Sequence, residues 1–346
     1  MDKERQERLD KLPAVIEGAH GTGGKMTHAL IENVFVPLFQ NRALQELNDQ
    51  AIVASPTSGR LALSTDSFVV KPYRFPGGNI GDLAVNGTVN DLLMGGATPK
   101  YLTASFILIE GLPMADLLEV AESMADAAKS AGVELVAGDT KVVEGSSGDG
   151  LFITTTGVGF VPDHVHWGPD KIQVGDVIIL SGTIADHGAS VMVERFGMAF
   201  DSEIVSDTAN LRDVVMNVRD LPGIRCMRDP TRGGLATTLS ELSAASHLTL
   251  RIEESSLPIR EDVRGICEIL GLDPLYVANE GKLVAVVAPE VAEEVVRRMR
   301  SVPESKEACI IGSVTDEIAG YAALTTLLGA RRLLELLTVE QLPRIC

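Results

Sequence analysis

The chain has 346 residues, of which 45% are apolar, and its formal net charge is −18. This length favours about two globular domains over one. The negative charge excludes nucleic acid and an anionic membrane as ordinary partners, because both would repel the protein. Residues 1–13 are charged throughout, and the longest apolar runs are far below the roughly 20 residues that cross a bilayer. We therefore expect a cytoplasmic protein without an export signal or a membrane span.

Residues 48–162 are predicted to form a first α/β lobe. An N-terminal segment, residues 1–47, precedes it with a charged start, a glycine-rich loop and a helix-like stretch. Short apolar runs indicate strands, and longer runs with apolar residues three and four positions apart indicate helices. The predicted strands are 51–54, 61–65, 100–109, 134–137 and 151–160, and the predicted helices are 80–94 and 114–131.

Residues 170–332 are predicted to form a second α/β lobe, after a linker at 161–176 where proline and glycine cluster. Its predicted strands are 177–180, 248–252, 283–287 and 308–311, and its predicted helices are 185–195, 233–245, 260–270 and 291–300. Residues 333–346 are predicted to be a flexible tail with one short helical stretch at 333–337.

The four cysteines lie in the last third of the chain without a CxxC pair, so the sequence indicates neither a zinc site nor a disulfide framework. Cys226, Cys267 and Cys309 are expected to be small buried core residues. Cys346 is the last residue, and the eight residues from Val339 span about 26 Å when extended. That reach is enough to carry a thiol from a cleft to a partner. A loose polar tail remains the alternative, as for most chain ends.

The glycine-rich segment GAHGTGGKM, residues 18–26, does not match the Walker A pattern. Ala19 and Met26 stand where that pattern requires glycine and serine or threonine. No strand clearly precedes the segment. On these residues alone, a flexible connector is favoured over a phosphate-binding loop.

Three aspartates are candidates for a metal site: Asp66 in STDSFVV, Asp91 in NGTVNDLLMGG and Asp139 in VAGDTK. A partly buried carboxylate needs a cation or a hydrogen-bond donor. The ends of strands are common ligand sites in α/β lobes, and hard divalent cations prefer carboxylate oxygens. Together the three predict a Mg²⁺ cage for a triphosphate, although each taken singly is more often a cap or turn residue.

The stretch DPTRGGLATTLSEL begins a predicted helix of the second lobe. Asp229 is expected to be its N-cap, with Pro230 at the first helical position. Gly233 and Gly234 leave the first backbone N–H groups bare, and Arg232 stands beside them. The helix start is therefore a candidate anion site, with a capped helix that binds nothing as the alternative.

Seven segments together resemble one family: TDSFVV, NDLLMGGATP, GDTKVV, SGTIADHG, DPTRGGL, ANEGK and the terminal PRIC. They are similar to the HypE family of hydrogenase maturation factors, in the superfamily of aminoimidazole ribonucleotide synthetase and selenophosphate synthetase. The resemblance covers residues 18–346, and the PRIC ending narrows it to HypE. A selenophosphate synthetase is expected to carry a reactive cysteine near the glycine-rich loop, whereas no cysteine of this sequence precedes Cys226.

The resemblance implies an α/β (α+β), two-domain PurM-like fold. The first lobe would bind ATP and contribute strands to the barrel of a homodimer, and the second would be an α/β sandwich. The implied activity is ATP-dependent dehydration of a carbamoyl group on Cys346 to a thiocyanate, a source of cyanide for the iron of nickel–iron hydrogenase. The implied partners are the carbamoyltransferase HypF and a HypC–HypD scaffold complex.

The resemblance also implies roles for particular residues. The implied cofactors are ATP and Mg²⁺, with Asp66, Asp91 and Asp139 as metal ligands. Further nucleotide-binding residues are implied at Ser67, Asn90, Asp229, Arg232 and Gly233. The implied catalytic residues are Cys346, Glu280 as the base, Lys141 beside the transferred phosphoryl group, and His20, which orients the substrate. For Glu280, an ordinary Asn-Glu-Gly turn remains the alternative.

Two other functions stay open on the sequence. One is a small-molecule kinase or synthetase of the same superfamily, in which Cys346 is incidental. The other is a nucleotide-binding scaffold that docks maturation factors without catalysis.

Overall fold

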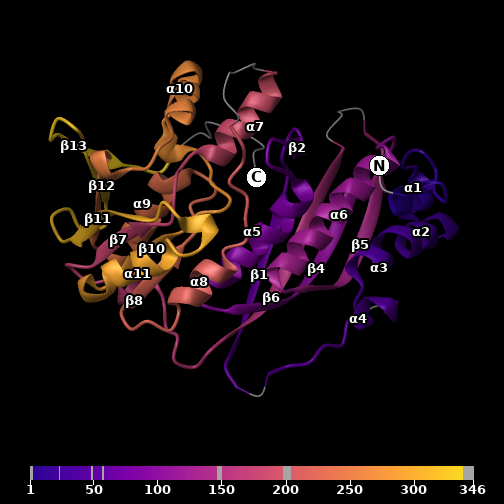
Figure 1. Cartoon of the computed structure of the whole chain (residues 1–346), viewed down its shortest axis with the longest axis horizontal. Helices are drawn as coiled ribbons and strands as arrows, with labels where there is room; N and C mark the ends of the chain where they lie inside the picture. Colours follow the sequence, from indigo (N-terminus) through magenta and orange to yellow (C-terminus); the bar gives the residue numbers. More distant parts are fainter. Residues whose placement is uncertain are drawn as a thin grey trace.

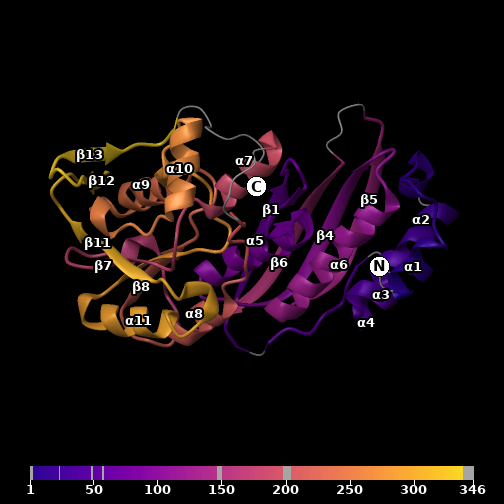
Figure 2. The same cartoon turned by 45° about the horizontal axis from the view of Figure 1, so that its top comes forward.

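The computed structural model describes residues 3–22, 24–47, 50–56, 58–145, 150–197 and 204–337. The chain forms two lobes that lie side by side (Figure 1). Helices α5 (Ile80–Met94) and α8 (Arg212–Val218) pack together at the junction between the lobes (Figure 2). Of the described helices, none is long and apolar enough to cross a membrane.

The first lobe is a four-stranded sheet with two long helices on one face (Figure 1). The strand order is β1-β6-β4-β5, in which β4 and β5 are parallel and the other neighbours are antiparallel. The strands are β1 (Arg60–Phe68), β4 (Thr98–Ile109), β5 (Glu134–Val143) and β6 (Leu151–Val161). The helices are α5 and α6 (Met114–Ala131), and a small hairpin of β2 (Arg74–Phe75) and β3 (Gly78–Asn79) precedes α5.

Local sequence explains how α5 begins and how it packs. The Asn79 side chain accepts a hydrogen bond from the backbone N–H of Gly81 at 2.8 Å, and Asp82 accepts one from the backbone N–H of Asn79 at 2.9 Å. A Cβ atom on Gly81 would lie 2.2 Å from the carbonyl oxygen of Val120. Glycine at this position therefore allows α5 and α6 to approach closely.

The opposite face of the four-stranded sheet carries large apolar side chains that contact solvent. Leu61 and Leu63 on β1 are 60% and 66% exposed, and Ile107 on β4 and Val143 on β5 are each 41% exposed. These residues alternate along their strands with residues that point toward the helices. Helices α5 and α6 leave this face uncovered, and we call it the open face.

The second lobe is a seven-stranded sheet between two helical layers. Its order is β13-β12-β9-β11-β7-β10-β8, in which β12 and β9 are parallel and the other neighbours antiparallel. Along β7, Ile178 and Leu180 pack in the core beneath α9, whereas Ile179 packs in the core shared with the first lobe. The strands are β7 (Val177–Leu180), β8 (Ile224–Arg228), β9 (Thr249–Glu253), β10 (Val284–Val287), β11 (Cys309–Thr315), β12 (Ala322–Thr325) and β13 (Arg331–Leu334). The helices are α7 (Asp186–Phe196), α8, α9 (Gly234–Ser246), α10 (Glu261–Leu270) and α11 (Ala292–Met299).

The N-terminal segment packs along the edge strand β5 (Figure 2). It contains α1 (Lys3–Leu9), the short turn η1 (Gly18–Gly21), α2 (Lys25–Leu30), the π-helical turn η2 (Ile31–Phe35), α3 (Val36–Phe39) and α4 (Arg42–Gln45). A Cβ atom on Gly21 would lie 2.5 Å from the backbone nitrogen of Val142 on β5. The prediction of a flexible connector at residues 18–26 is therefore wrong, because η1 is fixed against the sheet.

Most predicted elements are confirmed, and α5 and α6 have the predicted ends. The strand at 51–54 is wrong, since these residues have no regular structure. The helical stretch at 333–337 is also wrong, because Arg331–Leu334 pairs with β12 as strand β13. Strands β2, β3, β8, β12 and β13 and helices α1 and α8 were not predicted. Cys226 and Cys267 are buried as expected, and Cys309 is half-buried.

Candidate active site between the lobes

A cluster of carboxylates lies where β1 and α5 of the first lobe meet the end of β8. The Ser64 hydroxyl on β1 donates a hydrogen bond of 2.6 Å to Asp91 on α5. Asp91 and Asp229 both line a cavity of about 460 Å³. Asp66 lies on the same side of β1 as Ser64, two residues further along the strand. The structure therefore brings Asp66, Asp91 and Asp229 together, and we call them the acid cluster.

The charges of the acid cluster are crowded. Burial raises the pKa of Asp91, and the negative charge of Asp66 raises it further, while the hydrogen bond from Ser64 lowers it. Burial, followed by the charge of Asp91, raises the pKa of Asp229 to about 7. Carboxylates that repel one another in this way are stabilised by a bound cation.

Arg232 and the start of α9 supply positive charge at the same place. The Arg232 guanidinium lies 2.8 Å from the carboxylate of Asp66. Helix α9 has Gly233 as its N-cap, with a positive φ of 73° and no side-chain cap. The backbone N–H of Gly234 donates a hydrogen bond of 2.9 Å to the carbonyl oxygen of Thr231, so the prediction of bare N–H groups is wrong for the first group of the helix. The prediction that Asp229 caps the helix is also wrong. Asp229 lies directly after β8, and a turn separates it from the helix.

Glu280 is buried between the lobes with only 3% of its surface exposed. Its backbone N–H donates a hydrogen bond of 3.0 Å to the carboxylate of Asp207. Its side-chain oxygen Oε1 is buried and has no hydrogen-bond partner among the described residues. Burial, followed by the charge of Asp207, raises the pKa of Glu280 well above its usual range.

Asn90 lies beside the acid cluster, but its amide group already has three partners. Its oxygen accepts a hydrogen bond from the backbone N–H of Leu211 at 2.8 Å. Its nitrogen donates to the carbonyl oxygens of Ala209 at 3.0 Å and Glu280 at 3.2 Å. Asn90 therefore links the two lobes through three hydrogen bonds, and we call it a clamp for this reason. The family resemblance implied a nucleotide contact instead.

Ser67, Asp139 and Lys141 lie on the open face, away from the acid cluster. Ser67 shares a row across the sheet with Thr154, Ser105 and Asp139. Strands β1 and β5 are three strand spacings apart, which is about 14 Å. The Lys141 ammonium lies 2.8 Å from Asp139 and lowers the pKa of its carboxyl group. One chain thus brings Asp66 and Asp91 together but leaves Asp139 apart from them.

His20 lies in η1 at the β5 edge and is 1% exposed. The backbone N–H of Glu17 donates a hydrogen bond of 3.0 Å to its Nδ1 atom. Within one chain His20 is therefore near β5 and far from Glu280. The candidate residues form two groups, one between the lobes and one along β5.

Cys346 lies outside the described residues, which end at Leu337. The described chain leaves the second lobe close to the segment that carries Glu280. The Tyr276 hydroxyl donates a hydrogen bond of 3.0 Å to the carbonyl oxygen of Glu335, and Tyr276 precedes Glu280 by four residues. Nine further residues follow Leu337, and they span about 30 Å when extended.

No three His, Cys, Asp or Glu side chains in the described ranges lie close enough together to hold a metal ion. Two residues with contacts at the site were missed by the sequence analysis, Asp207 and Lys282. Lys282 lies in the ANEGK segment, but Asp207 had no motif that pointed to it.

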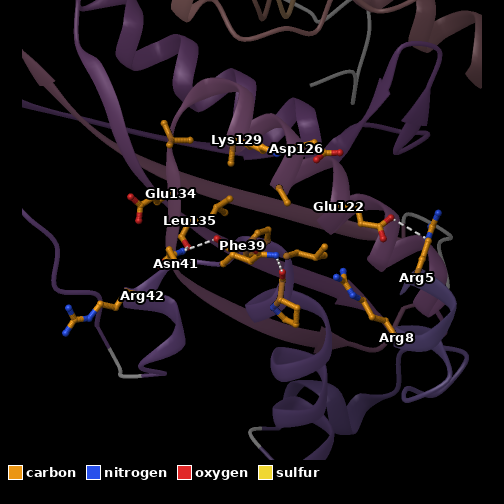
Figure 3. A pocket seen from close by; sticks show the side chains of 16 residues that line it. Arg5, Arg8, Phe39, Asn41, Arg42, Glu122, Asp126, Lys129, Glu134 and Leu135 are labelled. Atoms are coloured by element: carbon orange, nitrogen blue, oxygen red, sulfur yellow. Dashed lines mark hydrogen bonds and ion pairs between the residues drawn. The ribbon is translucent and has the colours of Figure 1, made fainter. Parts of the chain in front are cut away.

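A cavity of about 880 Å³, larger than the one beside Asp91, lies elsewhere (Figure 3). It is lined by residues of α1, α3, α4 and α6, and several labelled side chains are charged, including Arg5, Glu122 and Lys129. The Arg5 guanidinium lies 3.5 Å from Glu122. None of the predicted site residues lines this cavity, so size alone does not identify the active site.

The topology of the two domains and the acid cluster between them indicate the family to which the protein belongs. The chain belongs to the AIR synthase related protein family, since the model of the N-terminal domain matches residues 47–161 and that of the C-terminal domain matches residues 173–322. Carbamoyl dehydratase HypE of Azotobacter vinelandii is 49% identical over 340 residues, which cover 98% of this chain and 99% of that protein. Within the family, the chain is therefore a member of the HypE carbamoyl dehydratases.

Solved structures agree with this placement. A crystal structure described as hydrogenase maturation protein HypE in complex with ATP has a TM-score of 0.91 and 45% identity, covering 95% of this chain and 99% of that one. A crystal structure of a HypE–HypF complex has a TM-score of 0.77 and 44% identity, covering 89% of this chain and 99% of that one. The predicted two-domain PurM-like α/β fold is confirmed by these similarities.

Proposed function

We propose that this chain dehydrates a carbamoyl group carried on the thiol of Cys346 to a thiocyanate, with consumption of ATP. Membership of the HypE carbamoyl dehydratases supports the reaction class. The observation that carries the assignment to this site is the carboxyl group of Glu280. It is buried, and one of its oxygen atoms has no partner in the part of the chain that is described.

The reaction removes one oxygen atom and two N–H protons from S–C(=O)–NH₂ to give S–C≡N. Transfer of the γ-phosphoryl group of ATP to the amide oxygen makes phosphate the leaving group. The products are then the thiocyanate, ADP and phosphate. Glu280 fits the role of the base that accepts one N–H proton while the departing phosphate takes the other, because its raised pKa gives its carboxylate a higher proton affinity than an exposed glutamate has.

The acid cluster would supply part of a magnesium site. Asp66 and Asp91 would contribute oxygen ligands, and Asp229 lies beside them with a pKa raised to about 7. A bound Mg²⁺ ion would offset the negative charge of the triphosphate oxygens. Arg232 and the backbone N–H groups that follow Gly234 would bind phosphate oxygens at the start of α9.

We assign Asp139, Lys141, Ser67 and His20 to the same site through a second copy of the chain. Leu61 and Leu63 of the open face are exposed in a single copy of the chain, and a second copy would bury them. A homodimer that closes the two open faces into one barrel brings the β5 edge of each copy toward β1 of the other. Asp139 would then complete the metal ligands, and Lys141 would lie near the transferred phosphoryl group.

Mixing two inactive variants tests this shared site. Asp91→Asn and Asp139→Asn each remove one ligand. A mixed dimer of the two holds one intact site if the ligands come from different copies. Random exchange of subunits should then restore about one quarter of wild-type activity. No restoration at equal exchange would place both ligands in one chain.

The carbamoyl donor is proposed to be HypF, in line with the solved HypE–HypF complex. The acceptor of the cyanide is proposed to be a HypC–HypD complex. Adding HypC–HypD and a chemical reductant to the thiocyanate form should return the C-terminal peptide to the mass of the free thiol, because cleavage of the S–CN bond to a thiolate and a cyanide ion takes two electrons. A stable thiocyanate in its presence would exclude that acceptor.

Mass spectrometry of the C-terminal peptide tests the reaction itself. Carbamoylated protein incubated with MgATP should lose the mass of one water at Cys346. Glu280→Gln should keep ATP binding and fail to dehydrate, whereas the exposed Glu290→Gln should behave as wild type. An unchanged mass in the wild type would favour a non-catalytic scaffold. ATP turnover on a free substrate after removal of Cys346 would favour a small-molecule kinase or synthetase.

A further inference from the structure

Residues 204–211 form a segment that connects the two lobes, which we call the interlobe strap. On the first-lobe side, the backbone N–H of Ser206 donates a hydrogen bond of 2.7 Å to the carbonyl oxygen of Pro76. Asn90 holds the other end of the strap through the backbone groups of Ala209 and Leu211, at 3.0 and 2.8 Å. The strap is therefore fixed to the helix that carries Asp91.

On the second-lobe side, the strap holds Glu280 through Asp207. One carboxylate oxygen of Asp207 accepts the backbone N–H of Glu280 at 3.0 Å. The other oxygen lies 3.3 Å from the ammonium group of Lys282, and both side chains are at least 90% buried. A Cβ atom on Gly281 would lie only 1.8 Å from the carbonyl oxygen of Asp207. Only glycine therefore permits this approach.

Both backbone polar groups of Glu280 are thus held by residues that belong to, or bind, the strap. Asp207 accepts from its N–H, and the amide of Asn90 donates to its C=O at 3.2 Å. Asn90 precedes Asp91 in α5. These contacts set the position of Glu280 relative to the acid cluster, across the junction of the two lobes.

Stability alone does not account for the pair of Asp207 and Lys282. A buried ion pair is often no more stabilising than apolar residues of the same volume, because both charges must be removed from water. Here the pair lies directly against Glu280, and Asp207 also contributes to the raised pKa of its carboxyl group. A role in the reaction is the simpler account of charges retained at this place.

We propose that Asp207, supported by Lys282, is a positioning residue that fixes the position of Glu280 relative to the nucleotide site. The proposal rests on the proposed role of Glu280 as the base. It predicts that loss of Asp207 slows dehydration without weakening ATP binding, because the acid cluster and Arg232 do not depend on Asp207. A displacement of about 1 Å at a catalytic group costs on the order of 100-fold in rate.

The test measures the single-turnover rate of dehydration at Cys346 by mass spectrometry, as a function of ATP concentration. Asp207→Asn should lower the maximal rate about 10- to 100-fold and leave the half-saturating ATP concentration within about twofold. The double variant Asp207→Asn with Lys282→Met leaves no unpaired buried charge. It should fold and show the same loss of rate.

Asp176 offers a matched control in the same lobe. It is 2% exposed, accepts the backbone N–H of Gln173 at 2.7 Å and lies 3.3 Å from the guanidinium of Arg225. Asp176→Asn therefore breaks the ion pair of another buried aspartate, whose partner Arg225 is more exposed than Lys282. This pair lies away from Glu280, and its loss should leave the single-turnover rate unchanged. A rate for Asp207→Asn equal to that of Asp176→Asn would overturn the positioning role. If Glu280→Gln itself retained the wild-type rate, the proposed base would be wrong, and the two failures are thereby distinguished.

Discussion

Replacement of Asn90 by alanine distinguishes the clamp seen in the structure from the nucleotide contact indicated by the sequence. The substitution removes the partner of the Leu211 N–H and of two carbonyl oxygens, at 2.8, 3.0 and 3.2 Å. A buried polar group left without a partner costs about 1–3 kcal/mol. Three such groups, each near the lower end of that range, give an expected loss of about 3–5 kcal/mol in the free energy of unfolding. That is a large fraction of the roughly 5–15 kcal/mol that stabilises most domains.

Asn86 provides the control for this prediction. It lies one turn earlier in α5 and is 5% exposed, against 1% for Asn90. Its amide nitrogen makes one weak hydrogen bond of 3.4 Å to Thr208, and its oxygen is already unpaired within the described ranges. Asn86→Ala should therefore cost only about 1 kcal/mol. Urea unfolding followed by fluorescence of the single tryptophan, Trp167, measures both variants.

The refuting result would be a small loss of stability together with weaker nucleotide binding. If Asn90→Ala unfolds within about 1 kcal/mol of the wild type while its affinity for ATP falls tenfold, the side chain binds nucleotide. If stability falls and affinity is retained by the folded fraction, Asn90 is a clamp.

Three further predictions concern residues of the first lobe, namely Gly81, Asp82 and Leu63. Gly81→Ala should destabilise the protein by about 1–3 kcal/mol, because the new Cβ atom would lie 2.2 Å from the carbonyl oxygen of Val120. Gly265→Ala in α10 has free space around the new Cβ atom and should stabilise the protein by up to about 1 kcal/mol. Thermal unfolding compares the two variants, and equal shifts in melting temperature would contradict the close approach of α5 and α6. Burial raises the pKa of Asp82 to about 6, so the folded state binds this proton more tightly than the unfolded chain does, and the free energy of unfolding should fall by about 2–3 kcal/mol as pH rises from about 4 to 6. Asp82→Asn should remove that part of the pH dependence in urea unfolding, and an unchanged profile would exclude it. Leu63→Asp on the open face should convert a dimer to a monomer in sedimentation, and a dimer of unchanged affinity would show that the open face is not the interface.

The fold was largely predictable because its long elements carry strong local signals. Helix α5 begins at the capping residues Asn79 and Asp82, and α6 ends at Gly132 with a positive φ of 67°. The elements that were missed have weak signals. Strand β13 has the sequence RRLL at the edge of the sheet, and only its pairing with β12 makes it a strand. An isolated run of four such residues does not distinguish strand from helix.

The site was only partly predictable, because the sequence does not show which face of the sheet a residue occupies. Asp66 and Ser67 are adjacent in β1, so their side chains must point to opposite faces. This much was available from the sequence. The face of Asp139 was not, because it depends on a shift in register between β4 and β5 near Leu102. Asp207 could not be found either, because its role depends on contacts across the lobes.

The arrangement of the strap has a consequence for how the two reactants meet. The acid cluster and Arg232 would hold the nucleotide, while the tail that carries Cys346 leaves the second lobe beside Tyr276. Glu280 lies in the same stretch of chain as Tyr276, but its backbone is held by Asn90 from the first lobe. Glu280 is thus tied to both lobes, and a small rotation of one lobe would move it relative to the acid cluster or to the segment that contacts Glu335. Substitutions in the strap should therefore alter the rate of dehydration even though none of them touches a reactant.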